Sequence, residues 1–361
     1  MLSPILLVPR QQVPLPLKIA TFAGGIALGL LISFAILVSR GVAPDAIVNE
    51  FVVFVFLDLN GLAHVVTEAT TLALVGLASA AALKLKFWNI GVEGQLWLGA
   101  LAATGVATFD VGPAGARLFL MFAAGALAGA LWIAIPTFLK LKFEVNEIIT
   151  TLLMSYVAYL FVQHMVFGAW QDPGTNFPVS AHFDEGVERL ARLGWGSIHS
   201  GVFIALGACL LMWMLMNFSR FGFYMDAIGA NPAASKTAGI PVVLTVALAA
   251  LLSGGLAGLA GVNIVAGQEY RLTQYIGQGY TFSGIVIAFV ARFRPIPVVI
   301  TAFVVGGVYT AGETLKVFYQ LPEAIVVLIE AVILLSLVVV EFFGRYHITL
   351  GGTTKREGHS P

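Results

Sequence analysis

Three short polar clusters interrupt an otherwise apolar chain, and they hold the side chains that could do chemistry. The first runs from Trp88 to Gln95 (WNIGVEGQ), the second from Glu144 to Glu147 (EVNE), and the third from Gln268 to Thr281 (QEYRLTQYIGQGYT). Carboxylates and amides are costly to bury in lipid, so they are expected to face a cavity or one another. The chemistry that this favours is hydrogen bonding to a polar solute.

The glycines of the first cluster predict a broken helix. Gly91 and Gly94 interrupt any helix there and expose backbone groups, as the discontinuous helices of transporter sites do. From the second cluster onward, polar residues share one half of a helix surface: Asn146, Glu147, Thr150, Thr151 and Ser155. We therefore predict a substrate pathway lined by Trp88, Asn89, Glu93, Gln95, Asn146 and Glu147.

A structural interpretation of the two acids stays open. Glu93 and Glu147 also suit the starts of helices, or ion pairs with Lys86 and Lys142 at the inner face of a membrane. In that case they would serve an inner gate rather than a midplane site. Several aromatic residues could stack on a base or a sugar, although packing is the simpler interpretation of each: Trp88, Tyr156, Tyr270, Tyr275 and Tyr280.

No motif for an enzyme or a metal centre accompanies these clusters. The sequence contains no GxxxxGK[ST] loop, so we expect no nucleotide site or other cofactor in this chain. HExxH, CxxC, GxGxxG and a nucleophile elbow are missing as well, and the six histidines are scattered without ligand spacing. The single cysteine, Cys209, excludes an internal disulfide and lies in an apolar run.

The elements that must position the clusters are membrane spans. Of 361 residues, 59% are hydrophobic and 11% charged, with a mean hydropathy of +0.93, which no soluble domain tolerates. We predict an all-α integral membrane protein with a transmembrane domain over 19–342, flanked by tails at 1–18 and 343–361. Ten spans are expected, some of them broken, near Ile19–Val38, Gly61–Leu83, Gln95–Phe109, Leu118–Leu139, Ile148–Phe167, Val202–Met216, Val242–Val262, Phe282–Val290, Val298–Gly312 and Ala324–Val340. The eighth is too short to cross as a straight helix.

The distribution of basic residues supports this count. With ten spans and both termini in the cytoplasm, 13 of the 19 basic residues lie inside: Arg10, Lys18, Lys84, Lys86, Lys140, Lys142, Arg220, Lys236, Arg292, Arg294, Arg345, Lys355 and Arg356. Removing one span would move every later loop to the opposite side of the membrane, and the excess of basic residues on the cytoplasmic side would be lost.

The 19 acidic residues balance the 19 basic ones, so no positive electrostatic field that would attract nucleic acid is expected.

The cytoplasmic segment 219–241 carries the signals of a short docking helix. Asn231 suits the N-cap, Pro232 the first helical position and Gly239 a left-handed terminator. A capped helix of small side chains between two spans would present a compact knob to a partner that moves the membrane part. An ordered loop without such a role is the alternative.

One long segment, 168–200, is predicted on the outer side. Its acids give it local negative character: Asp172, Asp184, Glu185 and Glu188. A landing surface for an external binding protein and a solvated connection fit it equally well.

Within the spans, the pairs Gly25/Gly29, Gly125/Gly129 and Gly254/Gly258 predict close helix packing in one bundle rather than dimerisation.

Four stretches together resemble the permease subunits of bacterial ABC importers. They are FWNIGVEGQLWLGA (Phe87–Ala100), EVNEIITTLLMSYVA (Glu144–Ala158), IGANPAASKTAGI (Ile228–Ile240) and GQGYTFSGIVIAFVAR (Gly277–Arg292). The branch is the one shared with ribose and branched-chain amino acid permeases. The first two stretches look most like nucleoside and simple-sugar importers served by basic-membrane-protein lipoproteins. The resemblance runs from about Gly61 to Val340.

This resemblance implies a permease that binds no ATP itself and pairs with a second homologous permease. A cytoplasmic ABC ATPase, carrying ATP and Mg, would dock on the coupling residues, which are Gly229, Asn231, Pro232, Ala233, Ala234, Lys236 and Gly239. An external substrate-binding protein or lipoprotein would deliver the solute. The functional region of the family's first half maps onto Asn89, Gly91, Glu93, Gly94 and Gln95.

The expected activity is inward movement of nucleosides, purine nucleosides first, by alternating access across a bacterial cytoplasmic (inner) membrane. A ribose-like sugar permease is the alternative. An ion-coupled secondary transporter would use Glu93 and Glu147 as coupling carboxylates, but it would leave the capped helix without a role. The third hypothesis, a membrane enzyme or a structural scaffold, has little support, because the sequence contains no set of residues typical of a catalytic site.

Overall fold

The computed structural model describes residues 5–9, 14–276 and 279–350. Part of the predicted N-terminal tail (1–4 and 10–13), the end of the C-terminal tail (351–361), and Gly277 and Gln278 of the third polar cluster lie outside the described residues. The chain divides into two compact units, 1–47 with 321–361, and 48–320. The predicted all-α membrane architecture is confirmed, with one short strand pair in addition.

The first unit is a pair of long helices, α1 (Leu15–Ser39) and α13 (Glu323–Arg345), with strands β1 (Ile5–Pro9) and β2 (Tyr346–Leu350). The strands pair antiparallel, Ile5 opposite Leu350, so the two tails lie on the same side of any membrane that the helices cross. Gly25 and Gly29 let α1 approach α13, because an added Cβ would lie 2.9 and 2.7 Å from the Cα atoms of Leu337 and Ile333. This confirms the packing role of the pair.

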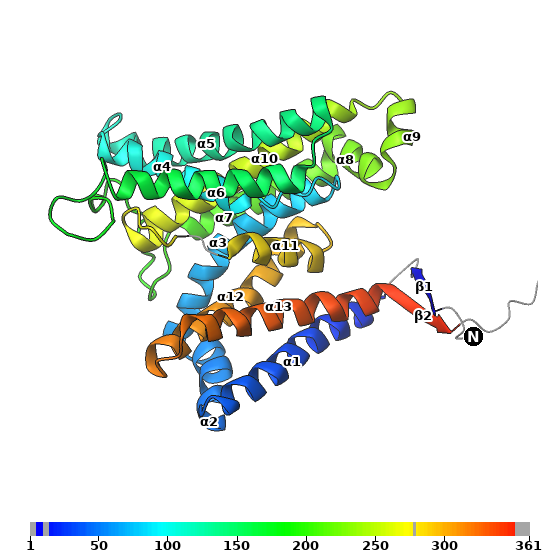
Figure 1. The fold of residues 1–361 in the computed structure, drawn as a ribbon, viewed down its shortest axis with the longest axis horizontal. Helices are drawn as coiled ribbons and strands as arrows, with labels where there is room; N and C mark the ends of the chain where they lie inside the picture. The colour runs from blue at the N-terminus through cyan, green and yellow to red at the C-terminus, as the bar shows by residue number, and fades with distance from the viewer. Residues whose placement is uncertain (1–4, 10–13, 277–278, 351–361) are drawn as a thin grey trace, which may run out of the picture. The chain divides into compact units, whose positions relative to one another are not determined.

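The second unit is a helical bundle built around α3 (Figure 1). Most of α3 is buried, since α10, α11 and α12 pack along it. By contrast, α5 and α6 expose apolar side chains along their outer faces. The short helix α2 (Pro44–Val48) leads into this unit, whose elements are η1 (Asn49–Leu57), α3 (Leu59–Leu83), α4 (Val92–Thr108), α5 (Ala114–Phe143), α6 (Glu147–Val166), α7 (Gly201–Phe218), α8 (Arg220–Ala230), α9 (Pro232–Thr237), α10 (Val242–Ile264), η2 (Val265–Glu269), α11 (Tyr280–Val290) and α12 (Pro295–Phe318).

All ten predicted spans are helical, but they are not equally long. Among the described residues, eight helices are long and apolar enough to cross a membrane. The other two are α4, with 17 residues, and α11, with 11. At 1.5 Å per residue α11 rises about 16 Å, roughly half of a hydrocarbon core. The eighth predicted span is therefore a half-helix, as its shortness in the sequence indicated.

A seam of glycines joins α4, α5 and α10, which lie side by side in Figure 1. A Cβ on Gly258 would overlap the carbonyl oxygen of Gly125, and one on Gly254 would overlap that of Gly129. Gly99 of α4 faces Gly258 in the same way. Close approach of these backbones is possible only because no side chain intervenes, which confirms the predicted use of both pairs within one bundle.

Neither η1 nor α8 was predicted from the sequence. The π-helix η1 packs an apolar turn against α3 and α12, with Phe56 near Phe303 at 6.5 Å between ring centroids. The segment 219–241 holds two helices rather than one, because α8 precedes the predicted docking helix α9.

Candidate functional site

The two amides of the first polar cluster bond to each other. Asn89 Nδ2 donates to Gln95 Oε1 at 2.9 Å, and Gln95 Nε2 donates back to Asn89 Oδ1 at 2.9 Å. Asn89 Nδ2 also donates to Ser253 Oγ of α10 at 3.0 Å, while its Oδ1 accepts the Gly91 N–H at 3.1 Å. Both amides are 1% exposed. This closed network braces the break before α4 and ties it to α10.

The same break packs directly on α6. The N–H of Ile90 donates to Thr151 Oγ1 and that of Gly94 to Ser155 Oγ, both at 3.2 Å. A Cβ on Gly94 would lie 2.6 Å from the Cα of Ser155, so only glycine permits this approach. Thr151 and Ser155, two residues of the polar half-surface predicted for α6, therefore pack against the start of α4, and Thr151 is fully buried.

A cavity of about 410 Å³ opens beside this contact, between α4, α6 and α11. Its polar groups are Glu93, Ser155 and Thr281, one from each helix. Trp97 and Tyr159 form an aromatic wall, edge to face at 5.6 Å between centroids. The remaining lining residues are Ile90, Leu152, Tyr156 and Phe282. Tyr156 and Phe282 are more than 60% exposed, so the cavity is open on one side of the bundle.

Glu93 joins this cavity to the start of α11. Its Oε1 accepts the N–H of Gly279 at 2.9 Å, and its own N–H donates to Thr281 Oγ1 at 3.0 Å. Gly279 has φ +85°, a left-handed conformation that suits glycine at the start of the half-helix. The start of α4 is thus joined to the backbone of Gly279 and the side chain of Thr281, which lie 186 and 188 residues from Glu93 in sequence.

A second carboxylate holds the next residue of α11. The hydroxyl of Tyr280 donates to Glu68 Oε2 of α3 at 3.1 Å. The Tyr280 ring stacks on Tyr309 of α12, with 5.9 Å between centroids, and the Tyr309 hydroxyl lies 2.7 Å from Ser283 Oγ. Glu68 was not predicted as a site residue, although a lone acid inside an apolar span was a usable signal.

The other predicted pathway residues lie away from the cavity. Glu147 is buried and its Oε2 is 2.8 Å from Lys140 Nζ, an ion pair of the kind anticipated, but with a different lysine. Asn146 is exposed and caps α6, its Oδ1 accepting the Ile148 N–H at 2.9 Å. Trp88 packs against Phe289, with the tilted rings 5.8 Å apart between centroids. Of the six predicted residues, Glu93 alone lines the cavity.

The short helix α9 has the predicted capping geometry. Asn231 Oδ1 accepts the Ala234 N–H at 3.1 Å, Pro232 is the first helical residue, and Gly239 has φ +78°. The predicted coupling residues Asn231, Pro232, Ala233, Ala234, Lys236 and Gly239 are all exposed, as are Thr237 and Ala238, whereas Ser235 is buried. α9 therefore presents a knob of small side chains on the surface.

Gly229, predicted to belong to the same knob, instead attaches α8 to the end of α3. A Cβ there would overlap the carbonyl oxygen of Lys84. The Lys84 Nζ lies 2.9 Å from Asp226 Oδ1 on α8. Helix α8 thus connects the exposed helix to α3, the central helix of the bundle.

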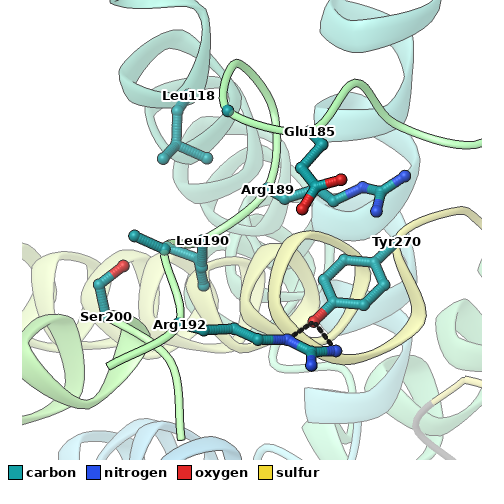
Figure 2. Close-up of a pocket in the computed structure, with 9 residues that line it drawn as sticks. Leu118, Glu185, Arg189, Leu190, Arg192, Ser200 and Tyr270 are labelled. Carbon is teal, nitrogen blue, oxygen red and sulfur yellow. Dashed lines mark hydrogen bonds between the residues drawn. The ribbon is translucent and has the colours of Figure 1, made fainter. Parts of the chain in front are cut away.

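A larger cavity of about 600 Å³ lies in the segment 168–200. Figure 2 shows Arg192 directed to the hydroxyl of Tyr270, with Arg189 and Glu185 beside the same ring. The two guanidinium carbons are 4.8 Å (Arg189) and 5.8 Å (Arg192) from the ring centroid, and Arg192 Nε and Nη2 donate to the Tyr270 oxygen at 3.3 Å. That hydrogen bond raises the pKa of the Arg192 guanidinium above its ordinary value.

Of the acids predicted to give this segment its negative character, Glu188 is buried. Its Oε1 lies 2.9 Å from Arg117 Nη1 of α5, and its Oε2 accepts the Asp184 N–H at 2.9 Å. A carboxylate so enclosed contributes nothing to a landing surface. The charged residues that line this cavity include both signs, namely Glu185, Arg189 and Arg192.

His199 is a buried titratable group that the sequence did not single out. It is 0% exposed, and its Nδ1 accepts the Gly201 N–H at 3.2 Å. Added Cβ atoms on Gly201 and Gly267 would each lie 2.6–2.7 Å or closer to ring atoms, so the ring fits between two glycine backbones. Burial lowers the pKa of His199 to about 4.

A bundle of membrane-length helices around an open polar and aromatic cavity, with a capped helix on its surface, defines a solute-translocating membrane subunit. Residues 61–338 match the family described as "Branched-chain amino acid transport system / permease component". The chain therefore belongs to this permease family. As in other permease subunits, ATP hydrolysis belongs to a partner ATPase and not to this chain.

Three relatives illustrate the family. The chain is 34% identical over 350 residues to a glucose ABC transporter permease protein of Haloferax volcanii, covering 94% of this chain and 92% of the relative. It is 33% identical to a guanosine ABC transporter permease protein of Bacillus subtilis, covering 78% and 82%. A nucleoside ABC transporter permease protein of Lactococcus lactis is 26% identical, covering 85% and 87%.

Proposed function

We propose that this chain is the membrane subunit of an ATP-driven importer for nucleosides, with purine nucleosides favoured. The observation that carries the proposal is the cavity between α4, α6 and α11. A carboxylate and two hydroxyls from Glu93, Ser155 and Thr281 supply hydrogen bonds, and the wall of Trp97 and Tyr159 supplies an aromatic surface. Ligand sites commonly combine a mostly apolar lining with a few placed polar groups, and a nucleoside has both faces.

The motion would enter through α9. A cytoplasmic ABC ATPase, with ATP and Mg bound to it, docks on the exposed face of this helix. Its movement passes through α8 to the end of α3, where Lys84 meets Asp226 and Gly229. Alternating access of the cavity follows, because α3 packs on α10, α11 and α12. We keep Glu93, Asn89 and Gln95 in the proposed pathway region. In this proposal the side-chain amides of Asn89 and Gln95 hold the start of α4 in place.

The remaining partners follow from the family. A second homologous permease completes the translocator, against the apolar outer faces of helices that are otherwise covered by membrane lipid. An external substrate-binding protein or lipoprotein lands on segment 168–200, where the cavity of Arg189 and Arg192 is exposed. The proposed location is the bacterial cytoplasmic (inner) membrane, with both tails inside.

A sugar importer is the second candidate, because the relative at 34% identity is named a glucose permease. An ion-coupled secondary transporter is less favoured. Glu147, one of its two coupling carboxylates, is committed to Lys140 at 2.8 Å. Glu93 Oε1 accepts the backbone N–H of Gly279.

The test is uptake of labelled guanosine by cells that express this chain with its neighbouring subunits. The control carries an ATPase disabled in its P-loop. Uptake that is lost with the disabled ATPase and is competed by nucleosides but not by glucose or ribose supports the proposal. Competition by glucose or ribose instead supports the sugar importer, and uptake that survives the disabled ATPase supports the secondary transporter.

A further inference from the structure

The Glu93 carboxylate is only partly occupied by contacts within the protein. Its Oε1 accepts the Gly279 N–H at 2.9 Å. The Thr281 side chain also hydrogen-bonds to the carboxylate, and Glu93 lines the cavity. A carboxylate has about four acceptor sites on its two oxygens, so these two bonds leave acceptor capacity for a solute. A carboxylate oxygen accepts hydrogen bonds and cannot donate them, so the solute must bring donors.

The rest of the lining narrows the class of solute. No Lys, Arg or His is among the described residues that line this cavity, so nothing there neutralises a phosphate or a carboxylate. A negative solute would meet the carboxylate of Glu93 with no cationic side chain beside it, which is unfavourable. The aromatic wall of Trp97 and Tyr159 is suited to the apolar face of a ring.

We propose that Glu93 is the residue that selects the solute, by accepting hydrogen bonds from vicinal hydroxyls of an uncharged ring, such as the 2′- and 3′-hydroxyls of a ribose. This inference rests on the proposed function and specifies which part of the nucleoside is recognised. Charge-assisted hydrogen bonds are about twice as strong as neutral ones, so the loss of both hydroxyls lowers affinity markedly. Nucleotides and sugar phosphates are excluded by the same carboxylate.

The shared carboxylate gives recognition a mechanical consequence. Since Oε1 holds the residue before α11, a solute bound to Glu93 shares its carboxylate with the start of that half-helix. The adjacent Tyr280 is held by Glu68 at 3.1 Å, so the start of α11 is fixed from α3 and α4 together. In this arrangement the Glu93 side chain contacts both the solute and the residue that precedes α11.

The test measures binding of tritiated guanosine to the purified complex of permeases and ATPase, without the external binding protein, which has its own selectivity. The competitor is 2′,3′-dideoxyguanosine. We expect the wild-type complex to bind guanosine about tenfold or more tightly than the dideoxy compound. In Glu93→Gln the amide oxygen can still accept the Gly279 N–H while an NH2 replaces Oε2, so the preference falls to about twofold or less. Glu144→Gln, an exposed acid outside the cavity, keeps the tenfold preference.

Either of two results overturns the inference while the proposed function stands. One is a wild-type complex that imports guanosine but binds both compounds equally, which requires no variant to fold. The other is a Glu93→Gln complex that keeps its preference. Guanosine import that is absent from wild-type cells, with glucose or ribose taken up instead, contradicts the nucleoside proposal itself. A matching loss of selectivity for deoxy sugars in Glu93→Gln would then still support the role of Glu93.

Discussion

The amide pair of Asn89 and Gln95 gives the sharpest test of the structure, through a double-mutant cycle. Asn89→Leu removes two bonds to Gln95 and one to Ser253, and it leaves the Gln95 amide and the Gly91 N–H buried without partners. Each unsatisfied buried group costs about 1–3 kcal/mol, so the free energy of unfolding should fall by about 4 kcal/mol. Gln95→Met should lower it by about 2 kcal/mol, because Asn89 keeps Ser253 and Gly91.

The double variant should lose about 4 kcal/mol rather than the sum, since the same two bonds are counted in both single variants. The coupling free energy is therefore about 2 kcal/mol. The assay is reversible unfolding of the purified permease in mixed micelles, titrated with SDS and followed by tryptophan fluorescence. Asn146→Leu is the matched control, because it removes an exposed cap worth about 1 kcal/mol and should not couple to Gln95→Met. Additivity of the Asn89 and Gln95 effects to within about 0.5 kcal/mol would refute the reciprocal pair.

Three further predictions concern docking, packing and acid stability. Ala234→Trp places a large ring on the exposed face of α9, so ATP-dependent uptake should fall at least about tenfold while membrane insertion is unchanged; normal uptake in inserted protein excludes docking at this face. Gly258→Leu forces α10 away from the Gly125 carbonyl, so the folded yield should fall severely, and an unaffected melting temperature would contradict the seam. His199 stays neutral in the fold down to a pKa of about 4 but takes up a proton below about 6.5 when unfolded. Stability present above pH 6.5 is therefore lost as the pH falls toward 4, by about 3 kcal/mol in all, and His199→Gln should remove that slope.

Of the six residues that the sequence assigned to the pathway, the structure places Glu93 at the candidate cavity. Glu93 and Trp97 are four residues apart on α4, and Ser155 and Tyr159 are four apart on α6, so helical spacing alone could have paired them. The side chains of Asn89 and Gln95 bond to each other and do not line the cavity. An isolated amide in a sequence gives no indication of which partner will satisfy it.

The sequence by itself determined the local and compositional features. Hydropathy gave the helices, and the signals at Asn231, Pro232 and Gly239 gave the capped helix, because capping and backbone preferences act within a few residues. The glycine pairs likewise indicated close packing. The family resemblance extended this to the class of protein, which the match over 61–338 supports.

Only the tertiary structure decided which acid lines a cavity and which is paired. Glu93 meets Gly279 and Thr281, Glu188 is enclosed by Arg117, and Glu147 bonds to Lys140. The sequence alone does not distinguish these three carboxylates. Glu93 and Glu147 lie in the first turn of a helix, and Glu188 lies in a loop. Their roles differ because the partners come from segments that are distant in sequence. Burying a carboxylate without a partner is costly, so the fold that supplies each buried carboxylate with a partner is the more stable one.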